Sequence, residues 1–234
     1  MATRAPRTAR AIARAELTRA ILDSAGQQLA EIGPAALSVR AVARDLGMAS
    51  SAVYRYFPSR DALLTALLIE AYDDLGEAVE GADAAVTDRD DLDGRWHGIC
   101  HAIRNWARAE PHRYALLYGS PVPGYSAPDD TVTSAVRVTT AFLSIYHDAQ
   151  VAGHHPATTI PLTDAEQAAL VPIRSLVEPR FDDDWSIRGL QAWATVFGTI
   201  SLELFGHMYR GVLDYDAHFA QLVDQLAADL GLGE

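Results

Sequence analysis

The side chains best suited to chemistry in this sequence are guanidinium, phenol and hydroxyl groups that gather between Leu37 and Leu64. Guanidinium groups donate paired hydrogen bonds to phosphate oxygens or to guanine, and serine and tyrosine hydroxyls bind phosphate oxygens. Such a set favours the binding of a polyanion over bond-breaking catalysis. Its members are Ser38, Arg40, Ser50, Ser51, Tyr54, Arg55, Tyr56 and Arg60.

Two histidines offer a competing chemistry. His97 and His101 are four residues apart on a predicted helix, a spacing that can present two imidazoles to one metal ion. The same helix face continues with Arg104 and Arg108, whose positive charges oppose a cation. No third or fourth ligand stands out in the sequence, so we predict no metal site.

Other catalytic motifs are missing from the sequence. No Gly-x-Ser-x-Gly elbow occurs, and the chain contains no lysine, which a P-loop or a Schiff-base mechanism would need. Cys100 is the single cysteine, so an intramolecular disulfide is excluded and a reducing compartment is expected. We therefore expect a protein that is not an enzyme and has no cofactor.

The polar set lies on a recognisable succession of helix signals. Ser38 can cap a short helix that stops at Gly47, and a second short helix is expected from Ser50 to Tyr56. Pro58 ends this second helix because proline disfavours helical geometry at the residue before it, and Ser59 can cap a longer helix. Two short helices around a glycine turn predict a helix-turn-helix, whose second helix enters the DNA major groove.

The charge of the chain is divided unevenly. Residues 1–60 hold nine arginines and four acids, so their charge is 9 − 4 = +5. The whole chain carries −12, which leaves −12 − 5 = −17 for the remainder. A basic end on an acidic body is typical of a protein that binds nucleic acid through that end.

At this point the sequence resembles a known family. The run from Leu46 to Arg60 resembles the DNA-binding domain of TetR-family transcriptional regulators, with arginine at a basic position where lysine is more usual. The residues that carry the resemblance are Leu46, Gly47, Ser50, Ser51, Tyr54, Arg55, Tyr56, Phe57, Pro58 and Arg60. The resemblance implies that Ser38 and Tyr54 bind phosphate with support from Tyr56 and Arg60. It makes Arg40, Ser50, Ser51 and Arg55 the candidates for base-edge contacts.

Apolar periodicity outside this run indicates helices throughout, without an alternating strand pattern, so the fold class is all-α. We expect a flexible basic arm over 1–15, the helix-turn-helix domain over 16–62 and an effector-binding and dimerisation domain over 63–234. The arginines of the arm, among them Arg4 and Arg14, could reach a minor groove or belong to a solvated tail.

Family resemblance implies an effector pocket between the helices of the larger domain, although core packing also explains most of its aromatic residues. The candidate ligand-binding residues are Trp96, Cys100, Ile103, Tyr118, Phe142, Tyr146, Trp193 and Phe197. The segment around Trp193 and Gly198 is also similar to a C-terminal subgroup named for a Trp, His and Gly motif, with Phe197 in place of the histidine.

The last two predicted helices provide a candidate dimer interface. Residues 186–210 read as a helix with two apolar faces, which needs two partners, and residues 215–230 as a helix with one. In the family, such helices pack against their copies as a four-helix bundle. The candidate interface residues are Leu202, Phe205, Phe219, Leu222 and Leu226.

Taken together, these features predict a cytoplasmic homodimeric repressor that binds an inverted-repeat operator in double-stranded DNA and is released by a small, largely apolar effector. No apolar run approaches the roughly 20 residues that span a membrane, so no membrane partner is expected. The alternative is a helix-turn-helix protein that binds DNA without an effector, and ligand-dependent release separates the two.

Overall fold

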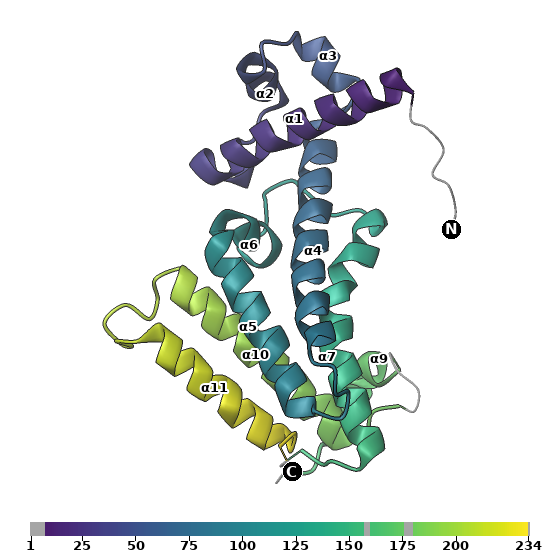
Figure 1. Cartoon of the computed structure of the whole chain (residues 1–234), viewed down its shortest axis with the longest axis vertical. Helices are drawn as coiled ribbons and strands as arrows, with labels where there is room; N and C mark the ends of the chain where they lie inside the picture. Colours follow the sequence, from purple (N-terminus) through teal and green to yellow (C-terminus); the bar gives the residue numbers. More distant parts are fainter. Residues whose placement is uncertain (1–7, 157–159, 176–179, 234) are drawn as a thin grey trace. The chain divides into compact units, whose positions relative to one another are not determined.

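A computed structural model describes residues 8–156, 160–175 and 180–233 of the chain (Figure 1). Every regular element in these ranges is helical, which confirms the predicted all-α class. The chain forms two compact units. The first contains residues up to Tyr72 together with His112–Val132, and the second contains Asp73–Pro111 and the chain from Thr133 onward. The predicted domain ranges, 16–62 and 63–234, stay a prediction.

The first unit is built around an apolar core to which its helices contribute. Ile21, Val42, Val53 and Leu63 are fully buried in it. The elements of this unit are α1 (Ala9–Ile32), η1 (Pro34–Ala36), α2 (Val39–Asp45), α3 (Ser50–Tyr54), the start of α4 (Arg60–Ala85), nearly all of α6 (Pro111–Tyr118) and η2 (Asp129–Thr131).

Local signals set the ends of the short helices, as predicted. The Ser38 hydroxyl accepts a hydrogen bond from the Ala41 amide at 3.4 Å, and the Ser59 hydroxyl accepts one from Ala62 at 3.0 Å. Gly47 lies in the left-handed region with φ 64°, where a side chain would be strained. The second short helix ends at Tyr54, two residues before the expected end.

The first helix begins earlier than expected. Thr8 caps α1 by accepting a hydrogen bond from the Ala11 amide at 3.3 Å, and the helix runs from Ala9. Residues 9–15 are therefore helical, which corrects the expectation that they belong to a flexible arm. The other arginines of the expected arm, Arg4 and Arg7, lie outside the described residues.

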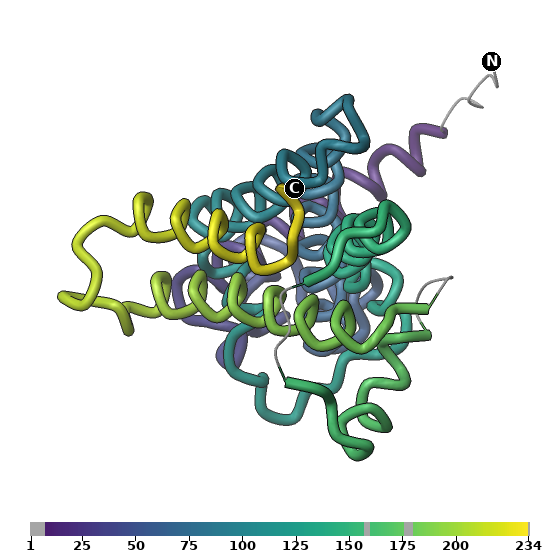
Figure 2. The backbone as a smooth tube through the Cα atoms, turned by 90° about the horizontal axis from the view of Figure 1, so that it is seen from below, coloured from purple at the N-terminus to yellow at the C-terminus, as the bar shows by residue number. Residues whose placement is uncertain are grey.

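The second unit combines long helices with short ones. They are the remainder of α4, α5 (Leu92–Ala109), most of α7 (Val132–Ala152), α8 (Asp164–Ala169), α9 (Val171–Arg174), α10 (Asp183–Leu204) and α11 (Tyr215–Leu230). Figure 2 shows α10 and α11, in green and yellow, running side by side in opposite directions. The expected helix over 186–210 ends at Leu204, because Gly206 turns the chain with φ 76°.

Buried arginines tie the helices of this unit together. Arg95 is fully buried and donates to Asp83 at 2.8 Å and to Asp148 at 2.7 Å, so it joins α5 to α4 and α7. Arg104 donates to both carboxylate oxygens of Glu203 at 2.8 Å and so joins α5 to α10. Such charges are tolerated in a core because each is paired and hydrogen-bonded.

None of the described helices combines the length and the apolar character that crossing a membrane requires.

Candidate nucleic-acid interface and ligand pocket

The outer surface of α2 and α3 carries most of the residues predicted to contact DNA. Val42 and Val53 are fully buried and hold the two helices on the core. Polar side chains of the same helices remain outside. Arg40, Ser51, Tyr54 and Arg55 are exposed, whereas Ser38 and Ser50 are half-buried. The packing of these helices therefore leaves guanidinium, hydroxyl and phenol groups accessible together.

Gln28 fixes α2 against α1, a role that sequence analysis missed. Its side-chain oxygen accepts the Ser38 amide hydrogen at 3.4 Å, and its nitrogen donates to Asp45 at 3.0 Å. Gln28 thus holds both ends of α2 while being 6% exposed. The signal in the sequence is a glutamine at helical spacing from Ile21 and Ala25, on the otherwise apolar face of α1.

Arg60 is engaged within the chain. Its Nη2 donates to the carbonyl oxygens of Pro34 and Ala35 at 2.7 and 3.2 Å, and its Nη1 lies 3.4 Å from Asp61. The guanidinium therefore ties the start of α4 to η1. This contact differs from the expected one, in which Arg60 supports phosphate binding.

Tyr56 is half-buried, and the guanidinium of Arg14 lies over its ring at 4.9 Å from the centroid. Arg14 belongs to the early turns of α1 that were expected to be a flexible arm. A positive charge from α1 is consequently held next to the end of the helix-turn-helix.

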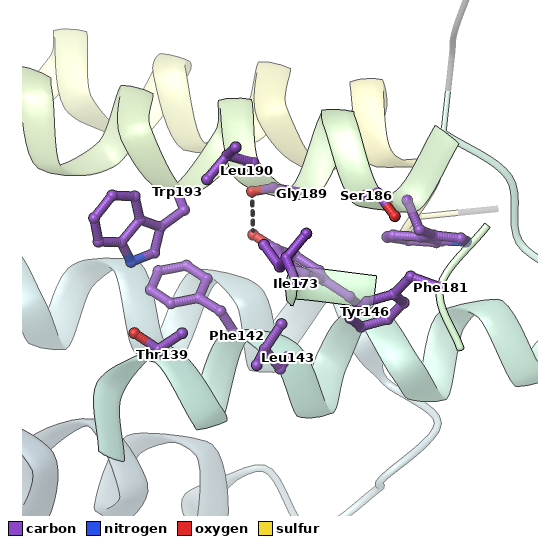
Figure 3. Close-up of a pocket in the computed structure, with 11 residues that line it drawn as sticks. Thr139, Phe142, Leu143, Tyr146, Ile173, Phe181, Ser186, Gly189, Leu190 and Trp193 are labelled. Atoms are coloured by element: carbon purple, nitrogen blue, oxygen red, sulfur yellow. Dashed lines mark hydrogen bonds between the residues drawn. The ribbon is translucent and has the colours of Figure 1, made fainter. Parts of the chain in front are cut away.

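The second unit contains an apolar cavity of about 250 Å³ between α7 and α10 (Figure 3). Ile173 of α9 and Phe181 contribute to its wall. The lining residues are Thr139, Phe142, Leu143, Tyr146, Ile173, Phe181, Trp185, Ser186, Gly189, Leu190 and Trp193. None of them carries a charge, so the cavity suits a largely apolar molecule.

The cavity includes part of the predicted ligand-binding set. Phe142, Tyr146 and Trp193 line it. Three other members of the set, Trp96, Cys100 and Ile103, are fully buried core residues of α5 and do not line the cavity. Burial also raises the pKa of the Cys100 thiol. The indole of Trp96 donates to the Val223 carbonyl at 3.0 Å, so its one polar group is paired in the core.

Two further residues of that set also lie outside the cavity lining. Tyr118 belongs to the first unit, where its ring packs on Tyr114 at a centroid distance of 5.2 Å. Phe197 packs against Trp193 at 4.9 Å but does not line the cavity. Helical periodicity placed both residues on apolar faces, but it could not show which faces meet at a cavity.

Most polar groups at the cavity already have partners. The Tyr146 hydroxyl donates to the Gly189 carbonyl at 3.3 Å, shown by the dashed line in Figure 3. The Ser186 hydroxyl donates to the Asp182 carbonyl at 2.6 Å. Burial raises the pKa of Tyr146, so its phenol stays neutral.

Arg137 connects α7, which lines the cavity, to α4. Its guanidinium donates to both carboxylate oxygens of Glu80 at 2.8 and 2.6 Å and to the Asp73 carbonyl at 2.9 Å. The hydrogen bond from Arg137 lowers the pKa of Glu80, which keeps this carboxylate charged. Gly76 makes room for the contact, because a Cβ there would lie 2.8 Å from the Arg137 Nε.

An exposed apolar patch follows α10 and the turn after it. Leu202 is 47% exposed and Phe205 is 43% exposed. The patch comprises Leu202, Phe205, Tyr209 and Leu213, whereas Leu190 lies more than three turns earlier on α10 and lines the cavity. Of the other predicted interface residues, Leu222 and Leu226 are half-buried, whereas Phe219 is fully buried under the Arg104 guanidinium within the subunit.

The two histidines of α5 contact other groups of the protein. His97 shares hydrogen bonds with the Asp93 carbonyl and the Asp224 carboxylate, both at 2.8 Å. His101 packs edge-on against Phe219 at a centroid distance of 5.6 Å. Among the described residues, no group of three or more His, Cys, Asp or Glu side chains is arranged to hold a metal ion.

Comparisons with known proteins agree with this architecture. Residues 21–67 match the sequence profile of bacterial regulatory proteins of the tetR family, and residues 96–226 match that of the tetracyclin repressor-like C-terminal domain. The HTH-type transcriptional regulators Rv1816 of Mycobacterium tuberculosis and Mb1846 of Mycobacterium bovis are each 43% identical over 231 residues, which cover 92% of this chain and 94% of the relative.

Solved structures show the same fold. The crystal structure of the regulatory protein SCO4313 is 31% identical, with a TM-score of 0.77 over 94% of this chain and all of that one. A protein of unknown function from Rhodococcus sp. RHA1 is 25% identical, with a TM-score of 0.70 over 92% of this chain and 95% of that one. The predictions of a DNA-binding regulator and of a protein that is not an enzyme are confirmed, while the Trp-His-Gly subgroup stays a prediction.

Proposed function

The chain belongs to the TetR family of bacterial transcriptional regulators, and on this premise we propose that it is a repressor released from its operator by a small, largely apolar effector. The observation that carries the proposal is the uncharged cavity against α7, because the same helix holds α4 through Arg137. A cavity of this kind favours the effector-dependent function over DNA binding without an effector.

For the operator contacts, we propose that Ser38 and Tyr54 bind phosphates and that Arg40, Ser50, Ser51 and Arg55 contact base edges. The exposure of Arg40, Tyr54 and Arg55 supports these roles. Phosphate contacts position a protein on DNA, whereas base-edge contacts carry sequence information. Tyr56, with Arg14 above its ring, supports the phosphate contacts from the end of the helix-turn-helix.

Arg40→Ala and Tyr54→Phe should therefore have different effects. Arg40→Ala should relax specificity at one base pair, by about 1–3 kcal/mol if the contact to guanine is bidentate. Tyr54→Phe should weaken binding to all sequences alike. A binding-site selection with both variants measures this difference. Loss of the same base preference in both variants would contradict the assignment, and Arg113→Ala in α6 serves as a control outside the helix-turn-helix.

The route that we propose for the effector signal runs along α4. This helix begins at Arg60, directly after the helix-turn-helix, and continues to Ala85 beyond the residues that Arg137 holds. A ligand shifts such an equilibrium only by its difference in affinity for the two arrangements, and coupling free energies are typically about 1–3 kcal/mol. Operator DNA should therefore weaken effector binding by the same factor.

Arg137→Met should uncouple the effector from the operator. The substitution keeps a flexible apolar stem over Gly76 but removes the hydrogen bonds to Asp73 and Glu80. We expect effector affinity to change little, while the coupling free energy falls from about 1–3 kcal/mol towards zero. Operator affinity with and without effector, measured by fluorescence anisotropy, gives this quantity.

Arg188→Met is the matched control for this variant. Arg188 pairs with Asp229 at 3.2 Å on α10 and α11, away from α4, so its loss should leave the coupling unchanged. If effector releases Arg137→Met from the operator as efficiently as the unmodified protein, the signal does not pass through the contacts of Arg137 with α4.

The proposed function itself is tested in two steps. A thermal-shift screen of apolar compounds identifies a ligand, and an operator found by selection is then titrated with protein in the presence and absence of that ligand. Release of the operator by the bound ligand is the expected result. If operator affinity is unchanged at saturating ligand, the protein is instead a DNA-binding regulator that works without this effector.

We further propose that the protein works as a homodimer on an inverted-repeat operator. The α3 helices of the two subunits would then contact half-sites about 34–36 Å apart if these half-sites lie in successive major grooves. The exposed apolar patch on α10 supports a second copy as the partner, because monomers rarely leave such surfaces uncovered. A repressor of chromosomal operators works in the cytoplasm, and we propose this location.

A further inference from the structure

Building on the proposed effector function, we infer that the cavity takes an uncharged ligand, larger than benzene, whose hydrogen-bond acceptor binds the indole N–H of Trp193. The inference rests on a hydrogen-bond donor, on the absence of charge around it and on the size of the space, and each of these is a separate observation.

The donor is the Nε1 of Trp193. This nitrogen is shielded from solvent and has no acceptor among the residues that the structure describes. An indole nitrogen can only donate, and a buried donor without an acceptor costs free energy that a new partner would recover. By contrast, the indoles of Trp96 and Trp185 donate to the carbonyls of Val223 and His154, at 3.0 and 3.2 Å.

The donor lies at one end of the cavity. Figure 3 shows the indole nitrogen on the edge of the ring that faces Phe142 and Thr139. At the opposite end lie Phe181 and Ser186, whose hydroxyl already donates to Asp182. A ligand can therefore place a carbonyl or ether oxygen at the Trp193 end and an apolar body towards Phe181. The acceptor reaches the shielded nitrogen through a rotamer change in the pocket, which is common on binding.

The lining excludes charged ligands on energetic grounds. Among the residues that the structure describes, no charged side chain lines the cavity, so a carboxylate would lose its hydration without meeting a cation. An organic cation would meet the positive end of the N–H dipole and no carboxylate. Cation–π contacts with the lining rings are worth about 2 kcal/mol for a desolvated cation, which is less than the several kcal/mol that an ion loses on leaving water.

The volume leaves room for a ligand larger than benzene. An engineered apolar cavity of about 150 Å³ binds benzene. The cavity of this protein is about 250 Å³, which has room for a ring together with a short chain. A ring with a short chain that ends in a ketone, ester or ether satisfies the size, the charge and the single acceptor.

Four probes of closely similar shape test the ligand class. Benzylacetone carries a ketone oxygen, and isopentylbenzene has a methyl group in its place. Hydrocinnamate carries a carboxylate, and dimethylphenethylammonium carries a cationic nitrogen. Their affinities for the unmodified protein and for Trp193→Phe are measured by titration calorimetry. Because isopentylbenzene is the more hydrophobic of the two neutral probes, the informative quantity is the change in affinity that the substitution causes for each probe.

We expect Trp193→Phe to weaken benzylacetone roughly tenfold, as for one lost hydrogen bond, and to leave isopentylbenzene unchanged. The unchanged affinity for isopentylbenzene also shows that the variant keeps its folded cavity. Trp106→Phe, which removes an indole of α5 outside the cavity, should change neither affinity. Hydrocinnamate and dimethylphenethylammonium should not bind measurably.

Three results would overturn the inference. An equal change in affinity for both neutral probes, or no change for either, would show that the indole N–H is not a ligand contact. Binding of either charged probe as tightly as benzylacetone would contradict the uncharged class. Failure of every probe to bind would exclude this cavity as a site for neutral ligands of this size. The proposed function fails separately, when a ligand binds in the cavity and the operator is not released.

Discussion

Replacing Arg104 with methionine should lower the free energy of unfolding by about 3–5 kcal/mol, because it leaves the Glu203 carboxylate buried without a partner. The Arg104 side chain is 4% exposed and that of Glu203 is 10% exposed. Both Glu203 oxygens accept hydrogen bonds from this guanidinium at 2.8 Å. Chemical denaturation measures the loss, at one fixed protein concentration because the stability of a dimer depends on concentration.

Two variants separate this effect from a general loss of charge. Arg108→Met removes a guanidinium that is 47% exposed and pairs with Asp216, so it should cost less than about 1 kcal/mol. Arg104→Met combined with Glu203→Leu removes both buried charges and should recover much of the stability. A single Arg104→Met variant as stable as Arg108→Met would contradict the importance of the buried pair.

The second large effect concerns self-association. Leu202→Glu should convert the proposed dimer into a monomer and so abolish tight binding to an inverted-repeat operator. Leu202 is 47% exposed in the single chain, so the substitution leaves the fold of the subunit intact. In a two-fold interface each residue occurs twice, and two desolvated carboxylates should weaken dimerisation by about 3 kcal/mol or more, over a hundredfold. Analytical ultracentrifugation gives the dissociation constant.

Val151→Glu is the matched control for Leu202→Glu. Val151 is 63% exposed on α7, outside the patch on α10, so the dimer should persist in this variant. We choose Leu202 rather than Leu222 because Leu222 is half-buried in its own subunit, where a glutamate would disturb folding. An unmodified protein that sediments as a monomer at micromolar concentration would refute the proposed dimer.

The parts of the fold that depend on neighbouring residues could be predicted from the sequence. The cap residues Ser38 and Ser59 and the turn at Gly47 act within three residues of their partners or through their own backbone angles. The pattern of hydroxyl, glycine and apolar residues was therefore sufficient to place the helix-turn-helix. The start of α1 was placed too late, because the small residues before Glu16 carry no strong apolar signal.

Contacts between distant segments could not be predicted in the same way. The Arg60 donors bind carbonyls 26 and 25 residues earlier, and Trp96 donates to a carbonyl 127 residues later. Backbone carbonyls have no signature in a sequence. The sequence pattern around a basic or aromatic residue is therefore the same whether its side chain contacts a ligand or its own chain.

The residues that line the cavity could be predicted only in part, for the same reason. Periodicity identified Phe142, Tyr146 and Trp193 as aromatic residues on helix faces, but it gave equal weight to Trp96 and Phe197. Phe181 and Ile173, which also line the cavity, lie outside the long helices and carry no periodic signal. Only the packing of α7 against α10 shows which of these side chains face a common space.

The contacts of Arg60 and Arg19 have a consequence for how operator affinity depends on ionic strength. The salt dependence of DNA binding counts the phosphates that a protein neutralises, because each releases condensed counterions. Arg60 is bound to backbone carbonyls, and Arg19 pairs with Asp23 and Glu70 at 2.8 Å. These two guanidinium groups are thereby occupied within the subunit. The nine arginines of residues 1–60 thus overstate the number of ions that each subunit releases when it binds DNA.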